Sequence, residues 1–261
     1  PVMPKGEPFL PGLDALPDMT IERFRSRRLL VRQLDGAFKR ASQSAAQARL
    51  DKFQQRAFAM LTSSKTRDAF DLSREPAKVR DRYGRNLYGA SILVARRLVE
   101  AGVRMVQVTL RGWDTHQNAF RDLKAKALPS LDYCLSGFLD DLEERGLLDE
   151  TLVVMCGEMG RTPKVQPISP NGKNASGERF TPGRDHWGHV FPCFFAGGGI
   201  QPGRVLGHTD YAAGAPVTEA YTPSDLAATI FHCLGIGPDR EFQDETGRPY
   251  RIYRGLSLIH I

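Results

Sequence analysis

Two short clusters of acidic and imidazole side chains stand out as groups that could do chemistry. Asp114 and His116 lie two residues apart, directly after a glycine and a tryptophan. Asp185, His186 and His189 form a second cluster within five residues. Carboxylate oxygens and imidazole nitrogens are ligands of hard and borderline divalent cations. The two clusters therefore predict a divalent-metal site, for which zinc is the first expectation and calcium or manganese are the alternatives.

A third motif, GEMGRTP at residues 157–163, adds one carboxylate and one guanidinium group. Its two glycines permit a sharp turn and a close approach of the backbone to a ligand. Glu158 is a further candidate metal ligand. Arg161 is a candidate for binding a substrate oxyanion, because a guanidinium group donates paired N–H groups. Arg184, next to the second cluster, is the other candidate for that role.

Each motif also has a structural interpretation that involves no ligand. Asp114 can cap the next helix, with His116 in its first turn, and the sequence favours capping and metal ligation equally here. Residues 157–163 can be a plain turn between a strand and a loop. At the second cluster, two histidines beside an aspartate favour ligation over a purely structural role. His208 and Asp210 lie in a polar turn, where ligation is the less favoured interpretation.

Two of the motifs follow apolar runs that are typical of buried parallel strands. Residues 103–110 precede Asp114, and residues 151–156 precede Glu158. A helix expected over residues 120–145 separates the two runs, which gives the β-α-β unit of a parallel sheet. Ligands bind at the C-terminal edge of the strands in such sheets. The sequence therefore predicts both acidic side chains at the same sheet edge.

The remaining elements are expected from periodicity and from capping residues. A helix over residues 87–101 ends at Gly102, and another begins at Thr222 as its N-cap, with Pro223 in the first turn. The long helix is expected to kink or to restart at Pro129. Further expectations are one or two helices over residues 19–63, a surface loop over residues 166–182, a third strand at residues 194–196 and core positions for Cys156 and Cys193.

The composition limits the class of protein. The chain has 261 residues, of which 41% are hydrophobic, enough for one large α/β domain or two small ones. The net charge is +6 at pH 7, but no basic run is interleaved with stacking aromatic residues, so no nucleic-acid partner is expected. The four cysteines include no C-x-x-C pair, which argues against a zinc knuckle. No apolar run reaches transmembrane length, so no transmembrane segment is expected.

The two ends of the chain differ from the rest. Residues 1–18 are proline-rich and are expected to be a connecting segment that is entered midway. Residues 256–261 resemble the in-frame translation of a common sequencing adapter and are expected to be a non-native tail. Residues 19–255 are expected to be part of a single α/β domain. His260 falls in the tail and is left out of the candidate sites.

The motifs together resemble the bacterial family known as domain of unknown function 1501. The resemblance covers roughly residues 20 to 255 and is carried by four strings, ARRLVEAGVR, GWDTH, GEMGRTP and GRDHW. That family is grouped with the alkaline phosphatase and sulfatase superfamily. The string TLVVMCGEMG looks like the superfamily's strand that leads to its second metal-binding loop.

The resemblance implies an α/β fold with a mostly parallel sheet flanked by helices and two divalent metals at the strand ends. Asp114 and His116 match the ligands of one metal. Glu158 takes the place of an aspartate at the second metal, and His186 or His189 would supply the remaining imidazole. The superfamily's nucleophile and first metal-binding aspartate would precede all these residues. The chain is therefore expected to be the C-terminal part of an alkaline phosphatase-like domain from an exported protein.

The function implied by the resemblance is metal-dependent hydrolysis of phosphate or sulfate esters, with an anionic small molecule or a glycan ester as substrate. Metals would hold the ester oxygen, while Arg161 and Arg184 would bind the oxyanion. Without the nucleophile, the chain is expected to be inactive on its own. One alternative is a non-catalytic protein that binds sulfated or phosphorylated glycans, favoured by Met159 where the superfamily usually has histidine or asparagine. The other is a scaffold in which the clusters are structural caps.

Overall fold

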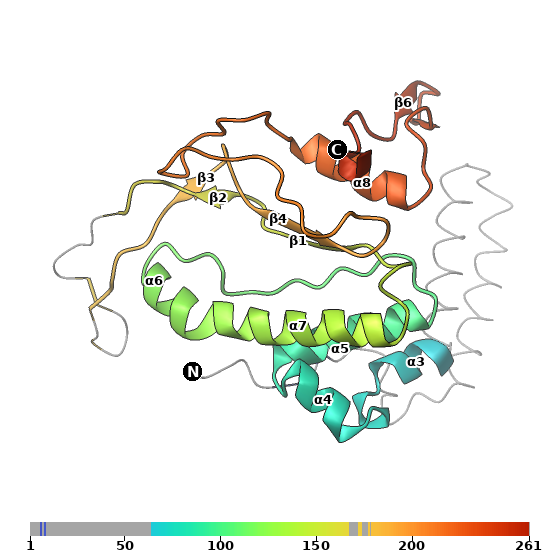
Figure 1. The fold of residues 1–261 in the computed structure, drawn as a ribbon, viewed down its shortest axis with the longest axis horizontal. Coiled ribbons are helices and arrows are strands. Elements are labelled where there is room, and N and C mark those ends of the chain that lie inside the picture. The colour runs from blue at the N-terminus through green and yellow to red at the C-terminus, as the bar shows by residue number, and fades with distance from the viewer. Residues whose placement is uncertain are drawn as a thin grey trace, which may run out of the picture. The chain divides into compact units, whose positions relative to one another are not determined.

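The computed structural model describes residues 6, 8, 64–166, 172, 173, 177 and 179–260. The helices expected over residues 19–63 lie outside these described residues. Figure 1 shows the described elements in their order along the chain. The chain divides into two compact units. We call them the helical unit, residues 2–110 and 130–138, and the mixed unit, residues 111–129 and 139–261.

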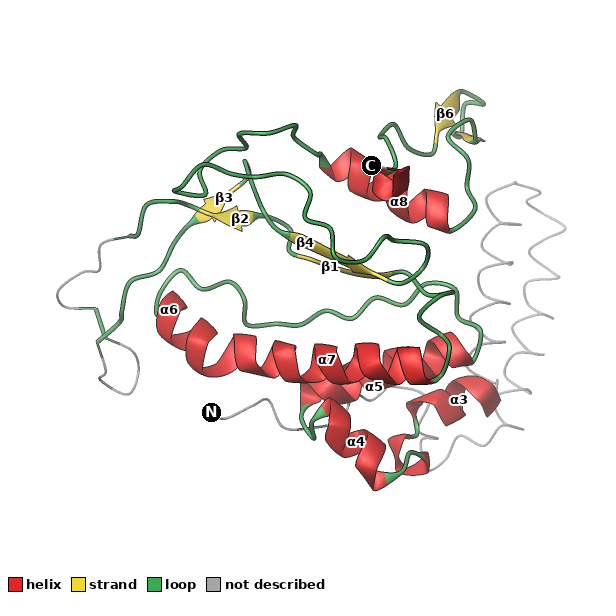
Figure 2. Ribbon diagram, viewed as in Figure 1, coloured by secondary structure: helices red, strands yellow, loops and turns green. Residues whose placement is uncertain are grey.

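The secondary-structure elements in the described part of the helical unit are all helices, which loops connect (Figure 2). α4 spans Ala77–Tyr83 and α5 spans Leu87–Glu100. The side chain of Asn86 caps α5 by accepting two backbone N–H groups of its first turn. The helix expected over residues 87–101 is thus confirmed, and Gly102 follows it with a φ of 90°. The other elements here are α3, Ser64–Phe70, and the 3-10 turn η1, Leu72–Arg74.

Helix α5 supplies most of the buried core of the helical unit. Its Leu93 is 1% exposed, and Tyr83 of α4 is fully buried. Gly89 lets the backbones approach closely, because a Cβ atom at this position would lie 1.9 Å from the carbonyl oxygen of Tyr83. The same cluster contains Leu72, Tyr88, Ala90, Ile92, Val94 and Cys134, with Val108 and Leu110 packed against it.

A buried group of charges also ties α5 to the chain before α4. Arg96 is fully buried, and its guanidinium nitrogens lie 2.8 Å from a carboxylate oxygen of Glu75 and 2.5 Å from one of Glu100. Arg97 forms a second ion pair with Glu75. Burial alone would raise the pKa of Glu75, but its bonds with Arg96 and Arg97 outweigh burial and lower that pKa. The carboxylate is therefore held in its charged form.

The mixed unit combines helices with short strands. Helix α7, Leu128–Glu144, contributes residues to both units and has Pro129 in its first turn. Residues 119–144 are helical throughout, and Ala127 before α7 is itself in the α region, so the expected restart at Pro129 is not observed. Helix α8, Pro223–Cys233, is capped by Thr222 and Asp225, each side chain accepting the backbone N–H of the other residue. The other elements are α6, Ala119–Asp122, the π-helical turn η2, Leu123–Ala127, β1, Val153–Cys156, β2, Gly160–Arg161, β3, His186–Trp187, β4, Cys193–Ala196, β5, Glu241–Gln243, β6, Pro249–Arg251, and the 3-10 turn η3, Leu258–His260.

Every strand pair among the described residues is antiparallel, which corrects the expectation of a mostly parallel sheet. β1 pairs with β4, β2 with β3, and β5 with β6. The runs at residues 151–156 and 194–196 do form strands, but an apolar run encodes neither the direction nor the partner of a strand. Cys156 and Cys193 are exposed rather than in the core, because they lie at the end of a two-stranded ribbon. The described fold is a mixture of helices and small antiparallel sheets.

Residues 103–110 form no strand, which corrects a second expectation. Their apolar residues nevertheless alternate, with Val106, Val108 and Leu110 half-buried and the residues between them exposed. Val108 and Leu110 pack against the core of the helical unit. An alternating pattern requires only that every second side chain is buried against something. Helices can cover these side chains even when no neighbouring strand is hydrogen-bonded to the segment. The expected β-α-β unit is therefore not formed within the described residues.

The C-terminal residues pack on α8. The backbone N–H of Leu256 donates to the Asp225 carboxylate at 2.8 Å, and that of Leu258 donates to the Thr229 hydroxyl at 2.8 Å. The non-native origin of residues 256–261 stays a prediction. Among the helices that the structure describes, none combines the length and the apolar character that a membrane span requires.

Candidate metal centre

A short ribbon in the mixed unit joins two of the sequence motifs. In the pairing of β2 with β3, Arg161 lies opposite His186. Glycine is required at position 160, because a Cβ atom there would lie 1.9 Å from the carbonyl oxygen of Val190. The arginine of GEMGRTP is thereby placed beside the second histidine cluster.

The first cluster is held against the chain segment that leads into β3. The N–H of Asn118 donates to the carbonyl of Thr181 at 2.8 Å, and its side-chain oxygen accepts the N–H of Thr181 at 2.7 Å. Gly183 packs closely on His116, since a Cβ atom on Gly183 would lie 2.1 Å from the His116 carbonyl oxygen. These contacts explain how side chains from distant parts of the sequence reach one place.

Three ligand atoms from Asp114, His116 and His186 lie close together, and we call these residues the triad. Asp114 Oδ1 is 3.0 Å from His116 Nε2 and 2.9 Å from His186 Nε2, and the two nitrogens are 3.1 Å apart. In a tetrahedral site with ligand bonds of about 2.0–2.1 Å, neighbouring ligand atoms are about 3.3 Å apart. The triangle is close to this size, so small adjustments would let all three atoms contact one ion.

Asp185 fixes the orientation of His116. Its Oδ1 lies 2.8 Å from His116 Nδ1. When Nδ1–H donates to this carboxylate, Nε2 keeps a free lone pair on the side that faces the triad, as a metal ligand requires. Asp185 is held in turn by the side-chain N–H of Gln166 and by backbone contacts with Thr162. Asp185 is therefore a positioning residue for His116.

Arg161 and His186 stabilise the charged form of Asp114. Arg161 Nη2 donates to Asp114 Oδ1 at 2.8 Å and to the carbonyl of Trp113 at 3.1 Å, while Nη1 donates to the carbonyl of Arg184 at 3.3 Å. The hydrogen bond with His186, and then that with Arg161, lowers the pKa of Asp114 to about 2. At neutral pH the triad therefore contains a carboxylate anion.

The donor set and the exposure of the triad fit a divalent cation. The side chains of Asp114, His116 and His186 are 62%, 42% and 44% exposed, so one side of the group is open to solvent. Three protein ligands with one open position are typical of catalytic metal sites, whereas structural sites are closed. The Asp114 carboxylate and the lone pair of His116 Nε2 face each other, and a cation between them would satisfy both.

Three other predicted ligands are not part of the triad. Asp185 contacts the nitrogen of His116 that faces away from it. Glu158 lies exposed in the turn between β1 and β2. His189 contacts Trp187 in a tilted arrangement, with the ring centroids 4.5 Å apart. The sequence motifs thus named the three residues that lie together, but not which members of each motif face one another. Metal ligation by these residues stays a prediction.

The remaining predicted residues have contacts of their own. Arg184 places its guanidinium carbon 5.5 Å from the centre of the Phe120 ring. Its Nε is buried and has no hydrogen-bond partner among the described residues. Asp210 accepts two backbone N–H groups of its own turn, which agrees with the less favoured status of ligation there.

Two residues that support Asp185, Thr162 and Gln166, were not predicted from the sequence. Thr162 lies inside the GEMGRTP motif, so the motif could have pointed to it. Gln166 begins a polar loop, where a side-chain amide is common and carries no signal of its own.

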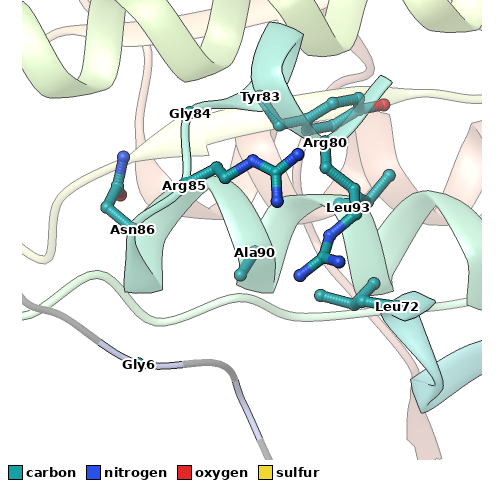
Figure 3. Close-up of a pocket in the computed structure, with 9 residues that line it drawn as sticks. All are labelled: Gly6, Leu72, Arg80, Tyr83, Gly84, Arg85, Asn86, Ala90 and Leu93. Carbon is teal, nitrogen blue, oxygen red and sulfur yellow. The ribbon is translucent and has the colours of Figure 1, made fainter. Parts of the chain in front are cut away.

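The helical unit also contains a pocket (Figure 3). Its volume is about 230 Å³, and Figure 3 shows the guanidinium groups of Arg80 and Arg85 beside it. Arg85 already donates to Asp81 at 2.5 Å, and the Asn86 oxygen caps α5. The pocket therefore offers no cluster of ligands comparable with the triad.

Among the comparisons with known proteins, the comparison with protein-family models gives a match. A family model described as "Protein of unknown function (DUF1501)" matches residues 1–260. No curated protein and no solved structure matches the chain.

Proposed function

This chain belongs to the DUF1501 family of proteins of unknown function, and on that premise we propose that it binds one divalent ion through its triad for the hydrolysis of phosphate or sulfate esters. The observation that carries the proposal is the convergence of Asp114, His116 and His186, whose ligand atoms lie 2.9–3.1 Å apart. Membership of the alkaline phosphatase and sulfatase superfamily, which the motifs resemble, is part of the proposal.

Zinc is the proposed ion. One carboxylate and two imidazoles are zinc ligands of the catalytic type. Calcium takes six to eight oxygen ligands, and the triad supplies few oxygens, so calcium is the poorer candidate. Manganese prefers carboxylate and water ligands, which also suits this donor set less well.

The residues around the triad have distinct proposed roles. A bound divalent ion would supply Lewis-acid stabilisation of an ester oxygen. Asp185 keeps the proton of His116 on Nδ1, and the bonds with His186 and then Arg161 lower the pKa of Asp114. Arg161 already donates to three oxygens. Arg184 is therefore the better candidate for the ester oxyanion, because its guanidinium group makes no ion pair with the residues that the structure describes and instead contacts the Phe120 ring.

The nucleophile is proposed to come from sequence that this chain does not contain. This part of the proposal is supported by the resemblance alone, since the superfamily's nucleophile precedes the motifs found here. The test of hydrolysis accordingly uses a chain extended upstream of Pro1, while the test of metal binding uses the chain as it is.

A second candidate function is metal-dependent binding of sulfated or phosphorylated glycans without catalysis. One observation favours it. Glu158 does not join the triad and the residue after it is Met159, so the described residues gather one group of ligands rather than the two metal sites expected for the superfamily.

The metal proposal is tested by zinc content after equilibrium dialysis. We expect close to one zinc ion per chain, and loss of most of it in His186→Ala. The matched control is His189→Ala, which removes an exposed imidazole outside the triad and should retain the zinc. Zinc retained in His186→Ala and lost in His189→Ala would overturn the assignment of ligands.

Hydrolysis then separates the two candidate functions. The extended chain, loaded with zinc, is assayed with 4-nitrophenyl phosphate and 4-nitrophenyl sulfate. Turnover that requires zinc and falls in Arg184→Gln supports the hydrolase. Stoichiometric zinc without turnover, together with zinc-dependent retention on heparin or on a phosphorylated glycan, supports the binding protein instead.

A further inference from the structure

Two cysteines face each other across the ribbon formed by β1 and β4. Cys156 ends β1, Cys193 begins β4, and the register pairs them directly. Figure 2 shows the two strands side by side. Directly opposed residues of an antiparallel pair project from the same face of the ribbon. The two thiol groups therefore share one face.

The backbone geometry of such a pair suits a disulfide bond. Directly opposed residues in an antiparallel ladder have Cα atoms about 4.5 Å or about 5.5 Å apart, depending on their hydrogen bonding. Disulfide bonds join residues whose Cα atoms are about 4.4–6.8 Å apart. Both kinds of position fall within this range, so the two cysteines can be joined without moving the strands apart.

The other two cysteines differ in their surroundings. Cys156 and Cys193 are exposed, whereas Cys134 is fully buried and Cys233 is half-buried. Burial raises the pKa of Cys134 to about 11, which leaves little of the reactive thiolate. Burial and the adjacent Cys156 thiol raise the pKa of Cys193, as expected for two interacting sulfur atoms. The two exposed cysteines are thus the same two that lie opposite each other in the ribbon.

We propose that Cys156 and Cys193 form a reversible disulfide and are a site of thiol–disulfide exchange with low-molecular-weight disulfides of the glutathione type. Neither cysteine belongs to the triad, and the proposal does not depend on the proposed function. Its ligand is a small disulfide, and its product is a covalent modification of the ribbon.

The exchange balances in two steps. The thiolate of one cysteine attacks a sulfur of oxidised glutathione, which forms a mixed disulfide and releases one glutathione thiolate. The thiolate of the second cysteine then attacks the protein sulfur of the mixed disulfide, which forms the Cys156–Cys193 bond and releases a second glutathione thiolate. The two cysteines lose two electrons and two protons, and one oxidised glutathione becomes two molecules of the reduced form.

The bond would close residues 157–192 into a loop. This loop carries β2 and β3, and therefore Arg161 and His186. Oxidation would covalently join the two ends of the segment that carries His186. Reduction would separate these ends again.

The test is the redox equilibrium of the full chain in glutathione buffers of fixed total concentration, with a chelator present to exclude metal. Free thiols are alkylated and the chain is cut with trypsin, which places each cysteine on a different peptide. In oxidised buffer we expect peptide 146–161 linked to peptide 185–204, with Cys134 and Cys233 alkylated. Transfer to reduced buffer should convert the linked peptides back to alkylated single peptides.

Two variants and one gel control the result. Cys233→Ser is the matched control and should retain the linked peptides, whereas Cys193→Ser should lose them and stop at a glutathione adduct on Cys156. Non-reducing electrophoresis distinguishes a bond within one chain from a bond between chains. The proposal is overturned if the wild-type chain carries only glutathione adducts, if Cys156 pairs with another cysteine, or if the link occurs only in dimers.

Discussion

The charge of Asp185 can be removed with little change of shape, which makes its role at His116 testable. We expect Asp185→Asn to weaken zinc binding by about 10- to 100-fold, because His116 loses the acceptor that fixes its proton on Nδ1. The dissociation constant is measured by competition with a chromogenic chelator. Asp149→Asn removes an exposed carboxylate outside the triad and should bind zinc as the parent does. An unchanged affinity in Asp185→Asn would contradict the positioning role.

Arg161 is expected to control the ionisation of Asp114. The hydrogen bond with His186, followed by that with Arg161, lowers the pKa of Asp114 from 3.8 to about 2. Because the folded-state pKa is the lower one, ionised Asp114 contributes stability above pH 3.8 that is lost as the pH falls toward about 2. We expect Arg161→Gln to raise this pKa but to leave it below 3.8, since the bond with His186 remains.

The measurement for Arg161 is a carboxyl-carbon NMR titration of the metal-free chain. Arg204→Gln serves as the control, because Arg204 is exposed and bonds to Gln201. A pKa of Asp114 that is the same in Arg161→Gln and in the parent would show that the ion pair does not form in solution.

Much of the triad was predictable at the level of single residues, because ligand chemistry is a property of residue type. Asp114, His116 and His186 were all candidates from the sequence. Their selection over Glu158 and His189 was not predictable, because it depends on which side chains of a turn and of a two-residue strand face one another. The sequence also could not show that Asp185 contacts His116 Nδ1, the ring nitrogen that faces away from the triad, and so positions His116 instead of joining the triad.

At the level of elements, the charged group on α5 gives a prediction about stability. Arg96 is fully buried and the Glu75 side chain is 8% exposed. Arg96→Ala leaves a buried carboxylate with fewer cations, so we expect the free energy of unfolding to fall by about 3–5 kcal/mol. Arg85→Ala breaks an exposed ion pair with Asp81 and should cost less than about 1 kcal/mol. Urea unfolding followed by far-UV circular dichroism measures both, and equal losses would contradict the prediction.

The elements that sequence analysis predicted correctly are those whose ends are marked by local chemistry. Asn86 and Gly102 bound α5, and Thr222 with Asp225 begins α8. Strand pairing has no such local mark. The run at residues 103–110 alternates as a strand does, yet its buried side chains pack against helices. The prediction of parallel strands was wrong for the same reason, because the apolar run itself does not encode its hydrogen-bonding partner.

At the level of the whole molecule, the two units can be followed separately by spectroscopy. Trp113 and Trp187 are the two tryptophans of the chain, and both belong to the mixed unit. Tryptophan fluorescence therefore reports the unfolding of the unit that contains the triad. A ligand that binds only the folded state stabilises it by mass action, by about 2.7 kcal/mol at a hundred times its dissociation constant.

We therefore expect zinc at that concentration to shift the fluorescence-detected urea transition of the parent chain to higher urea. His186→Ala should abolish the shift, since it removes one of the three ligands. His208→Ala removes an exposed imidazole from a polar turn and should keep the shift, so it controls for the loss of a histidine in the same unit. A shift that survives in His186→Ala would mean that zinc binds elsewhere in the mixed unit. The convergence of the triad would then be a set of hydrogen bonds rather than a metal site.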